Sequence, residues 1–199
     1  MRFAAFFTVL VVLLGLASAD ASPMVNLVTN GGFETGDFTG WTLSGNTSLA
    51  FVSNTPNAPH TGSYAAQFGE VGSLGYLTQA IATTVGDNYQ LNFWLVGTSS
   101  AGPTNEFSAT MGGNTLLDLV NYQAPTTWTE YTYDITATST STSLQFGFRQ
   151  DPSYVALDDV SVVDLGTSGT IPEPSTLIVW SLLGGLGASF AWWRTRKAA

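Results

Sequence analysis

Carboxylates are the side chains of this sequence that could do chemistry together. Glu34 lies in a Gly-rich stretch near one end, and Asp158 and Asp159 are adjacent near the other. Carboxylate oxygens ligate hard cations such as Ca²⁺, and paired carboxylates catalyse glycoside hydrolysis. Neighbouring residues of a strand face opposite ways, so we expect that Asp158 and Asp159 cannot flank one scissile bond. The acids therefore favour metal binding over catalysis.

Other catalytic side chains are scarce. The chain has no Cys, one His (His60) and no Lys before its C-terminal tail. Disulfides, thiolate metal sites and Cys nucleophiles are therefore excluded. A Ser-His-Asp site would need His60, which lies in a turn rich in Pro and Asn and is interpreted as an ordinary loop residue. We predict no catalytic residue and no enzyme.

Aromatic side chains offer a second kind of site, because the apolar faces of sugars pack on rings while their hydroxyls need hydrogen-bond partners. Trp94 lies on the more polar face of the alternating stretch YQLNFWLV. Tyr76 and Tyr154 are candidate neighbours. The alternative for these rings is ordinary packing in the core, which we predict for Trp41 and Trp128.

Net charge limits the partners. Thirteen of the 14 acidic residues, but only one basic residue (Arg149), lie between Asp20 and Asp164, which gives this stretch a charge of −12. Such a surface repels phosphate backbones, so we predict no nucleic-acid partner. It could attract divalent cations, or simply keep the protein soluble outside the cell.

Short segments with period-two patterning must position these residues. They are separated by Gly, Asn, Pro or Asp, which is typical of strands in an antiparallel β-sandwich or barrel. We expect one domain over residues 20–165, followed by a linker over 166–174. The candidate strands are 25–29, 41–43, 49–53, 63–68, 76–83, 89–97, 107–111, 115–120, 129–135, 143–149 and 155–163.

The N-terminal residues 1–19 have the order of a signal peptide. Arg2 precedes an apolar run, and small residues follow at Ala17, Ser18 and Ala19. This order predicts export and cleavage between Ala19 and Asp20.

The C-terminal part predicts a membrane span. Residues 175–193 are apolar or small, and as a helix they would extend about 28 Å at 1.5 Å per residue, enough to cross a bilayer. The tail 194–199 follows with Arg194, Arg196 and Lys197. Since basic residues stay in the cytoplasm, we predict that the domain lies outside.

Pro172, Glu173 and Pro174 precede this span, and a segment flanked by Pro stays extended. The order of Pro-Glu-Pro, apolar span and basic cluster resembles the PEP-CTERM sorting signal of Gram-negative bacteria. The resemblance implies an exosortase-type membrane protease as partner, processing near the motif, and delivery to the cell surface or to an exopolysaccharide matrix. The alternative is an ordinary juxtamembrane linker.

Two stretches carry a second resemblance: NLVTNGGFETGDFTGWTLSGN at 26–46 and YVALDDVSVVD at 154–164. They are similar to the opening and closing strands of galactose-binding-like jelly rolls, which include carbohydrate-binding modules. The resemblance implies a structural Ca²⁺ held by Glu34, by Asp158 or Asp159, and by backbone oxygens near Gly32 and Gly62. The alternative is that these acids only solubilise a turn and cap a strand.

Three hypotheses follow for the function. The leading one is a non-catalytic exported protein of the cell surface or extracellular matrix, anchored in the inner membrane before processing. The second is a lectin-like module that binds exopolysaccharide. The third is an unusual glycoside-acting hydrolase.

Overall fold

The computed structural model describes residues 24–98 and 104–167. Within these ranges the chain forms ten strands and no helix, so no helix there could span a membrane. The predicted signal peptide, membrane span and sorting motif lie outside the described residues. The strands are β1 (Thr42–Gly45), β2 (Ala50–Ser53), β3 (Ala65–Phe68), β4 (Gly75–Ala82), β5 (Asp87–Gly97), β6 (Glu106–Met111), β7 (Asn114–Val120), β8 (Thr129–Thr136), β9 (Ser141–Arg149) and β10 (Val155–Thr167).

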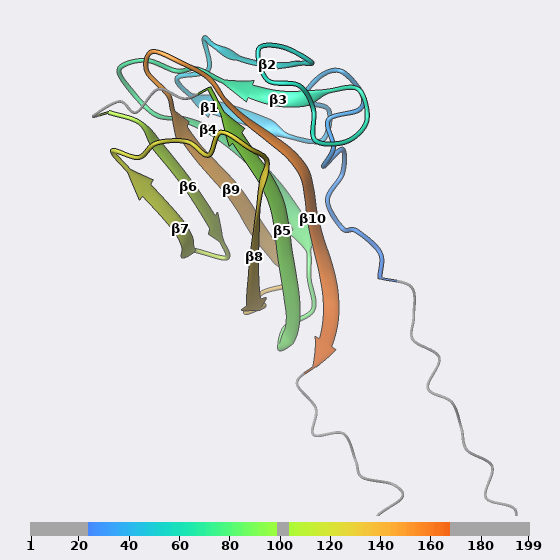
Figure 1. Ribbon diagram of the computed structural model, residues 1–199. Coiled ribbons are helices and arrows are strands. Elements are labelled where there is room, and N and C mark those ends of the chain that lie inside the picture. Colours follow the sequence, from blue (N-terminus) through green and yellow to red (C-terminus); the bar gives the residue numbers. More distant parts are fainter. Residues whose placement is uncertain (1–23, 99–103, 168–199) are drawn as a thin grey trace, which may run out of the picture.

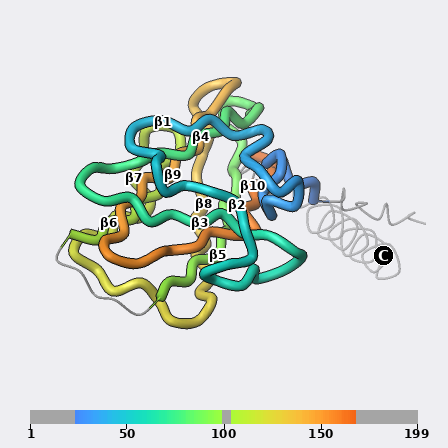
Figure 2. Tube along the Cα trace, turned by 90° about the horizontal axis from the view of Figure 1, so that it is seen from above, coloured from blue at the N-terminus to red at the C-terminus, as the bar shows by residue number. Residues whose placement is uncertain are grey.

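The strands form two five-stranded sheets packed as layers (Figures 1 and 2). One sheet has the order β1-β4-β9-β6-β7 and the other has the order β2-β3-β10-β5-β8. All strand pairs are antiparallel. The prediction of an all-β antiparallel sandwich is confirmed.

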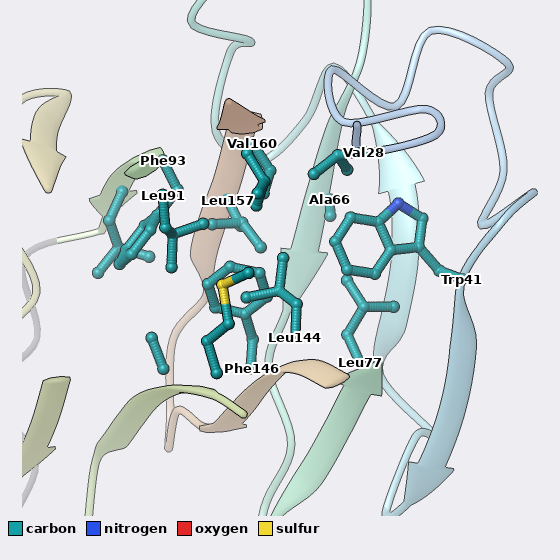
Figure 3. Close-up of a cluster of buried hydrophobic side chains, with 14 of the residues drawn as sticks. Val28, Trp41, Ala66, Leu77, Leu91, Phe93, Leu144, Phe146, Leu157 and Val160 are labelled. Carbon is teal, nitrogen blue, oxygen red and sulfur yellow. The ribbon is translucent and has the colours of Figure 1, made fainter. Parts of the chain in front are cut away.

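Alternate residues of the strands build the core between the sheets (Figure 3). Phe93 from β5 meets Phe146 from β9 edge-on, with ring centroids 5.1 Å apart. Trp41 is buried as predicted, and its indole nitrogen donates to the carbonyl oxygen of Asn30 at 3.2 Å. The residues that β5 and β9 contribute to this core are fully buried, namely Leu91, Phe93 and Leu95 on β5 and Leu144, Phe146 and Phe148 on β9.

The first candidate strand, 25–29, was wrong. This segment makes only one isolated bridge, between Asn26 and Val163. The side-chain oxygen of Asn26 accepts hydrogen bonds from the backbone N–H groups of Val28 and Val162, both at 3.0 Å. A side chain thus replaces the backbone ladder, and the chain turns at Asn30, which has a φ of +53°.

The domain boundary also differs slightly from the prediction. Strand β10 continues to Thr167, so its pairing with β5 extends into the predicted linker 166–174. Gly166 pairs with Asn88 after an irregularity in register and has a φ of +75°, which glycine adopts freely.

Candidate functional site

A row of four residues, one on each of four neighbouring strands, crosses the outer face of the sheet β1-β4-β9-β6-β7. Tyr76 on β4 pairs with Gly147 on β9, Gly147 with Ser108 on β6, and Ser108 with Asp118 on β7. A Cβ placed on Gly147 would lie 2.6 Å from Ser108 Oγ and 3.2 Å from a ring carbon of Tyr76. The tyrosine ring therefore lies against the sheet at the glycine, beside a hydroxyl group.

Polar groups flank this row on both sides. On one side, Gln145 Nε2 donates to Thr78 Oγ1 at 3.1 Å. On the other side, Arg149 pairs in register with Glu106. Yet the Nε–H of Arg149 is buried and has no hydrogen-bond partner among the described residues. The ion pair found among these residues joins His60 and Asp159 instead. The face thus combines one ring with polar side chains, and the Nε–H of Arg149 is a donor left unpaired.

The three aromatic residues predicted to contact a ligand do not lie together. Tyr76 belongs to the face described above, whereas Trp94 lies on β5 of the other sheet. The imidazole of His60 stacks on Trp94 with ring centroids 3.9 Å apart, so one face of the indole is covered. Tyr154 contacts Phe51 edge-on at 5.5 Å.

Asp158 and Asp159 hold the segment 54–64 on the outer side of that second sheet. Asp158 Oδ2 accepts hydrogen bonds from the backbone N–H groups of His60 at 2.8 Å and Thr61 at 3.3 Å. Asp159 Oδ2 lies 2.6 Å from His60 Nδ1, and Asp159 Oδ1 accepts from Thr61 Oγ1 at 2.7 Å. Both carboxylates therefore bind the same two residues.

This arrangement corrects the expectation that the two acids face opposite ways. Asp159 has a φ of +48°, and the pairing of β10 with β5 shifts register between Asp158 and Ser161. A β-bulge re-aims a side chain, so strict alternation fails at this point. Burial raises the pKa of Asp158 to about 6; the charge of Asp159 adds to this, and backbone N–H groups oppose it.

Glu34 fastens the same segment from another side. Its carboxylate accepts from the backbone N–H of Ser63 at 2.9 Å and from that of Tyr64 at 3.0 Å. Gly62 has a φ of +65°, and a Cβ there would lie within 2.2 Å of Glu34 Oε1. Glycine is needed at this position on both counts.

The metal prediction stays a prediction. A Cβ on Gly32 would lie 3.6 Å from Asp159 Oδ1 and 3.9 Å from Asp158 Oδ1, so Gly32 borders two of the predicted ligands. No group of three or more acidic or histidine side chains within residues 24–98 and 104–167 is arranged to hold a metal ion. The hard oxygen donors fit Ca²⁺, but backbone carbonyl oxygens would have to complete the site.

Comparison with protein families identifies the domain. A family model described as a carbohydrate binding domain matches residues 25–153. The chain belongs to this family. Its description is that of a binding domain, which agrees with the prediction that the chain is not an enzyme and favours the lectin-like hypothesis over a purely structural one. The resemblance to carbohydrate-binding modules is thereby confirmed.

Solved structures show the same fold for this carbohydrate binding domain. TmCBM61 in complex with β-1,4-galactotriose matches with a TM-score of 0.54 and 23% identity, over 69% of this chain and 97% of that one. The K3 cleaved adhesin domain of Lys-gingipain from Porphyromonas gingivalis matches with a TM-score of 0.52 and 18% identity, over 70% and 98%. A family 16 carbohydrate binding module gives 0.51 and 17%, over 69% and 99%. No curated protein sequence matches the chain.

Reasoning from the sequence missed most of the open face of this carbohydrate binding domain. Gly147, Ser108 and Gln145 were assigned to strands but not to a site, and Arg149 was noted only for its charge. The sequence did contain a signal for this face, because in SLQFGFRQ the residues that alternate with the apolar ones are small or polar. What the pattern could not give is the order of strands that sets these residues side by side.

Proposed function

We propose that the domain binds a polysaccharide on the outer face of the sheet β1-β4-β9-β6-β7. One observation carries the proposal: in a member of the carbohydrate binding domain family, the ring of Tyr76 lies against Gly147, and the row continues with the polar residues Ser108 and Asp118. A sugar ring packs on an aromatic side chain through its apolar face, and its hydroxyls bind the polar groups around it.

The neighbouring groups suit both roles of a sugar hydroxyl. Arg149 Nε–H and the Gln145 amide are donors, whereas the carboxylates of Asp118 and Glu106 are acceptors. The Nε–H of Arg149 has no partner among residues 24–98 and 104–167, so a hydroxyl oxygen that accepts from it would satisfy this donor. Five strands about 4.8 Å apart span roughly 19 Å, which suits an oligosaccharide better than a single sugar.

Affinity electrophoresis on a panel of soluble polysaccharides, including the exopolysaccharide of the producing cells, tests the proposal. We expect Tyr76→Ala to weaken retention about tenfold or more, equivalent to about 1.4 kcal/mol. The matched control is Tyr64→Ala, because Tyr64 is 38% exposed and its side chain lies near Gly36. Equal retention of Tyr76→Ala and the wild type, or no retention of the wild type on any polymer, would contradict the proposal.

We propose further that the chain is exported and sorted. The support is in the sequence alone: the signal pattern before Asp20, the Pro172-Glu173-Pro174 motif and the basic cluster of Arg194, Arg196 and Lys197. A polysaccharide-binding domain delivered in this way would act at the cell surface or in the extracellular matrix, with an exosortase-type protease as its processing partner.

Mass spectrometry of the mature protein from intact cells tests the sorting proposal. We expect a first residue of Asp20 and a last residue close to 172–174. Recovery of protein that still carries Trp192, Trp193 and the basic cluster would instead indicate a permanent membrane anchor.

A further inference from the structure

Two fully buried polar side chains lie at the end of the sandwich where β3 and β9 finish. Glu70 follows β3, Gln150 follows β9, and both side chains are 0% exposed. The backbone N–H of Gln150 donates to the carbonyl oxygen of Glu70 at 3.0 Å, so the two residues are direct neighbours. They take no part in the face around Tyr76.

The polar atoms that these side chains leave unpaired are all acceptors. Both carboxylate oxygens of Glu70 and the Oε1 of Gln150 are buried and accept no hydrogen bond. The amide nitrogen of Gln150 donates to Ser153 Oγ at 3.3 Å, which uses the donor end of that side chain. Buried acceptors without partners cost free energy, so three of them together indicate a missing ligand.

Within the part of the chain that the structure describes, no basic side chain forms an ion pair with Glu70. The ion pair found within residues 24–98 and 104–167 is the one between His60 and Asp159. Burial raises the pKa of Glu70 to about 7, and the backbone N–H groups of Glu70, Leu49 and Gly69 oppose this rise.

We propose that Glu70 and Gln150 bind a hard divalent cation of the Ca²⁺ type. Such a cation takes carboxylate, amide carbonyl, backbone carbonyl and water oxygens together, so one ion would satisfy the three unpaired acceptors at once. The strong negative charge between Asp20 and Asp164 raises the local concentration of divalent cations. An anion would not match a set made only of acceptors, whereas a hard cation matches all three oxygens.

This site is separate from the acids around Gly32. Glu34 binds the backbone of Ser63 and Tyr64 just before β3, whereas Glu70 lies beyond the other end of that strand. Six residues of extended chain span roughly 20 Å at 3.3 Å per residue. The two sites can therefore be tested one at a time.

Calorimetric titration of Ca²⁺ into the chelator-treated full chain at pH 8 tests the proposal. We expect Glu70→Gln to bind one equivalent fewer than the wild type, because it removes the charge and keeps the shape. The matched control is Asp158→Asn, which alters a buried carboxylate at the other site and should keep the equivalent that depends on Glu70. Equal stoichiometry in Glu70→Gln and the wild type, or no binding to the wild type, would overturn the proposal.

A second variant protects the test against misfolding. Gln150→Leu removes one acceptor and puts an apolar side chain of similar size in its place, so we expect it to weaken the Glu70-dependent equivalent at least tenfold without abolishing it. If Gln150→Leu folds and binds Ca²⁺ with unchanged affinity, Gln150 is not a ligand and the proposed site is wrong.

Discussion

Two buried carboxylates give the stability of this domain a pH dependence that runs against the usual direction. Burial raises the pKa of Glu70 to about 7 from 4.5, and that of Asp158 to about 6 from 3.8. Below about pH 3 the folded and unfolded chains both hold these protons. As pH rises toward 7, the unfolded chain releases them first, so the free energy of unfolding falls.

We therefore expect the melting temperature to fall by several degrees between pH 4.5 and 7.5, measured by circular dichroism with a chelator present. Glu70→Gln and Asp158→Asn should each flatten the slope, since neither side chain titrates. The lowered pKa of Asp37 acts only below its ordinary value of 3.8, outside this window. A melting temperature that is constant or rises across the window would show that these carboxyl groups do not keep their protons in the folded chain.

For single residues, the sequence could predict which acidic residues belong to the site but not the directions of their side chains. Glu34, Asp158 and Asp159 were identified, and all three hold the segment 54–64 or its neighbours. Their directions were missed because the left-handed φ of Asp159 depends on contacts with His60 and Thr61, which lie almost 100 positions away in the sequence. No local pattern carries that information.

The segment 54–64 behaves as one element, fastened at several points to the sheet β2-β3-β10-β5-β8. Asn57 Nδ2 donates to Gln67 Oε1 at 3.0 Å, His60 stacks on Trp94, and Glu34 holds the end of the segment. Gly62→Ala should loosen this element, because the new Cβ would meet the Glu34 carboxylate. We expect a loss of about 1–3 kcal/mol in the free energy of unfolding relative to the control below, measured in urea.

The control is Gly86→Ala, because Gly86 has a φ of +90° but no atom would lie within 4 Å of a Cβ placed there. It carries the conformational strain without the clash. Similar losses for the two variants would mean that the contact with Glu34 does not hold the segment in place.

For the strands themselves, period-two alternation was sufficient, and ten of the eleven candidates are found within a few residues of the predicted bounds. The prediction of a strand at 25–29 failed because the side-chain oxygen of Asn26, and not its backbone, accepts the hydrogen bond from the backbone N–H of Val162. The order of strands was beyond prediction, because neighbours such as β4 and β9 are joined by pairing between distant positions.

At the scale of the whole molecule, the outer faces of the two sheets differ: segment 54–64 packs on one, and the other carries the proposed binding row. The segment 54–64 lies on one face, where His60 stacks on Trp94. On the other face the row from Tyr76 to Asp118 consists of small and polar residues. A core about 10 Å thick separates the faces, so effects on one should add to effects on the other.

A double-variant experiment tests this separation. Trp94→Ala removes the ring on which His60 stacks and should lower the free energy of unfolding by about 2 kcal/mol or more, with polysaccharide retention unchanged. Tyr76→Ala should weaken retention with a much smaller effect on unfolding, since its ring is only partly buried. The double variant should then show the retention of Tyr76→Ala and the stability loss of the two single variants added together. If Trp94→Ala weakens retention as strongly as Tyr76→Ala, the sugar contacts the sheet that carries Trp94, and the proposed binding face is wrong.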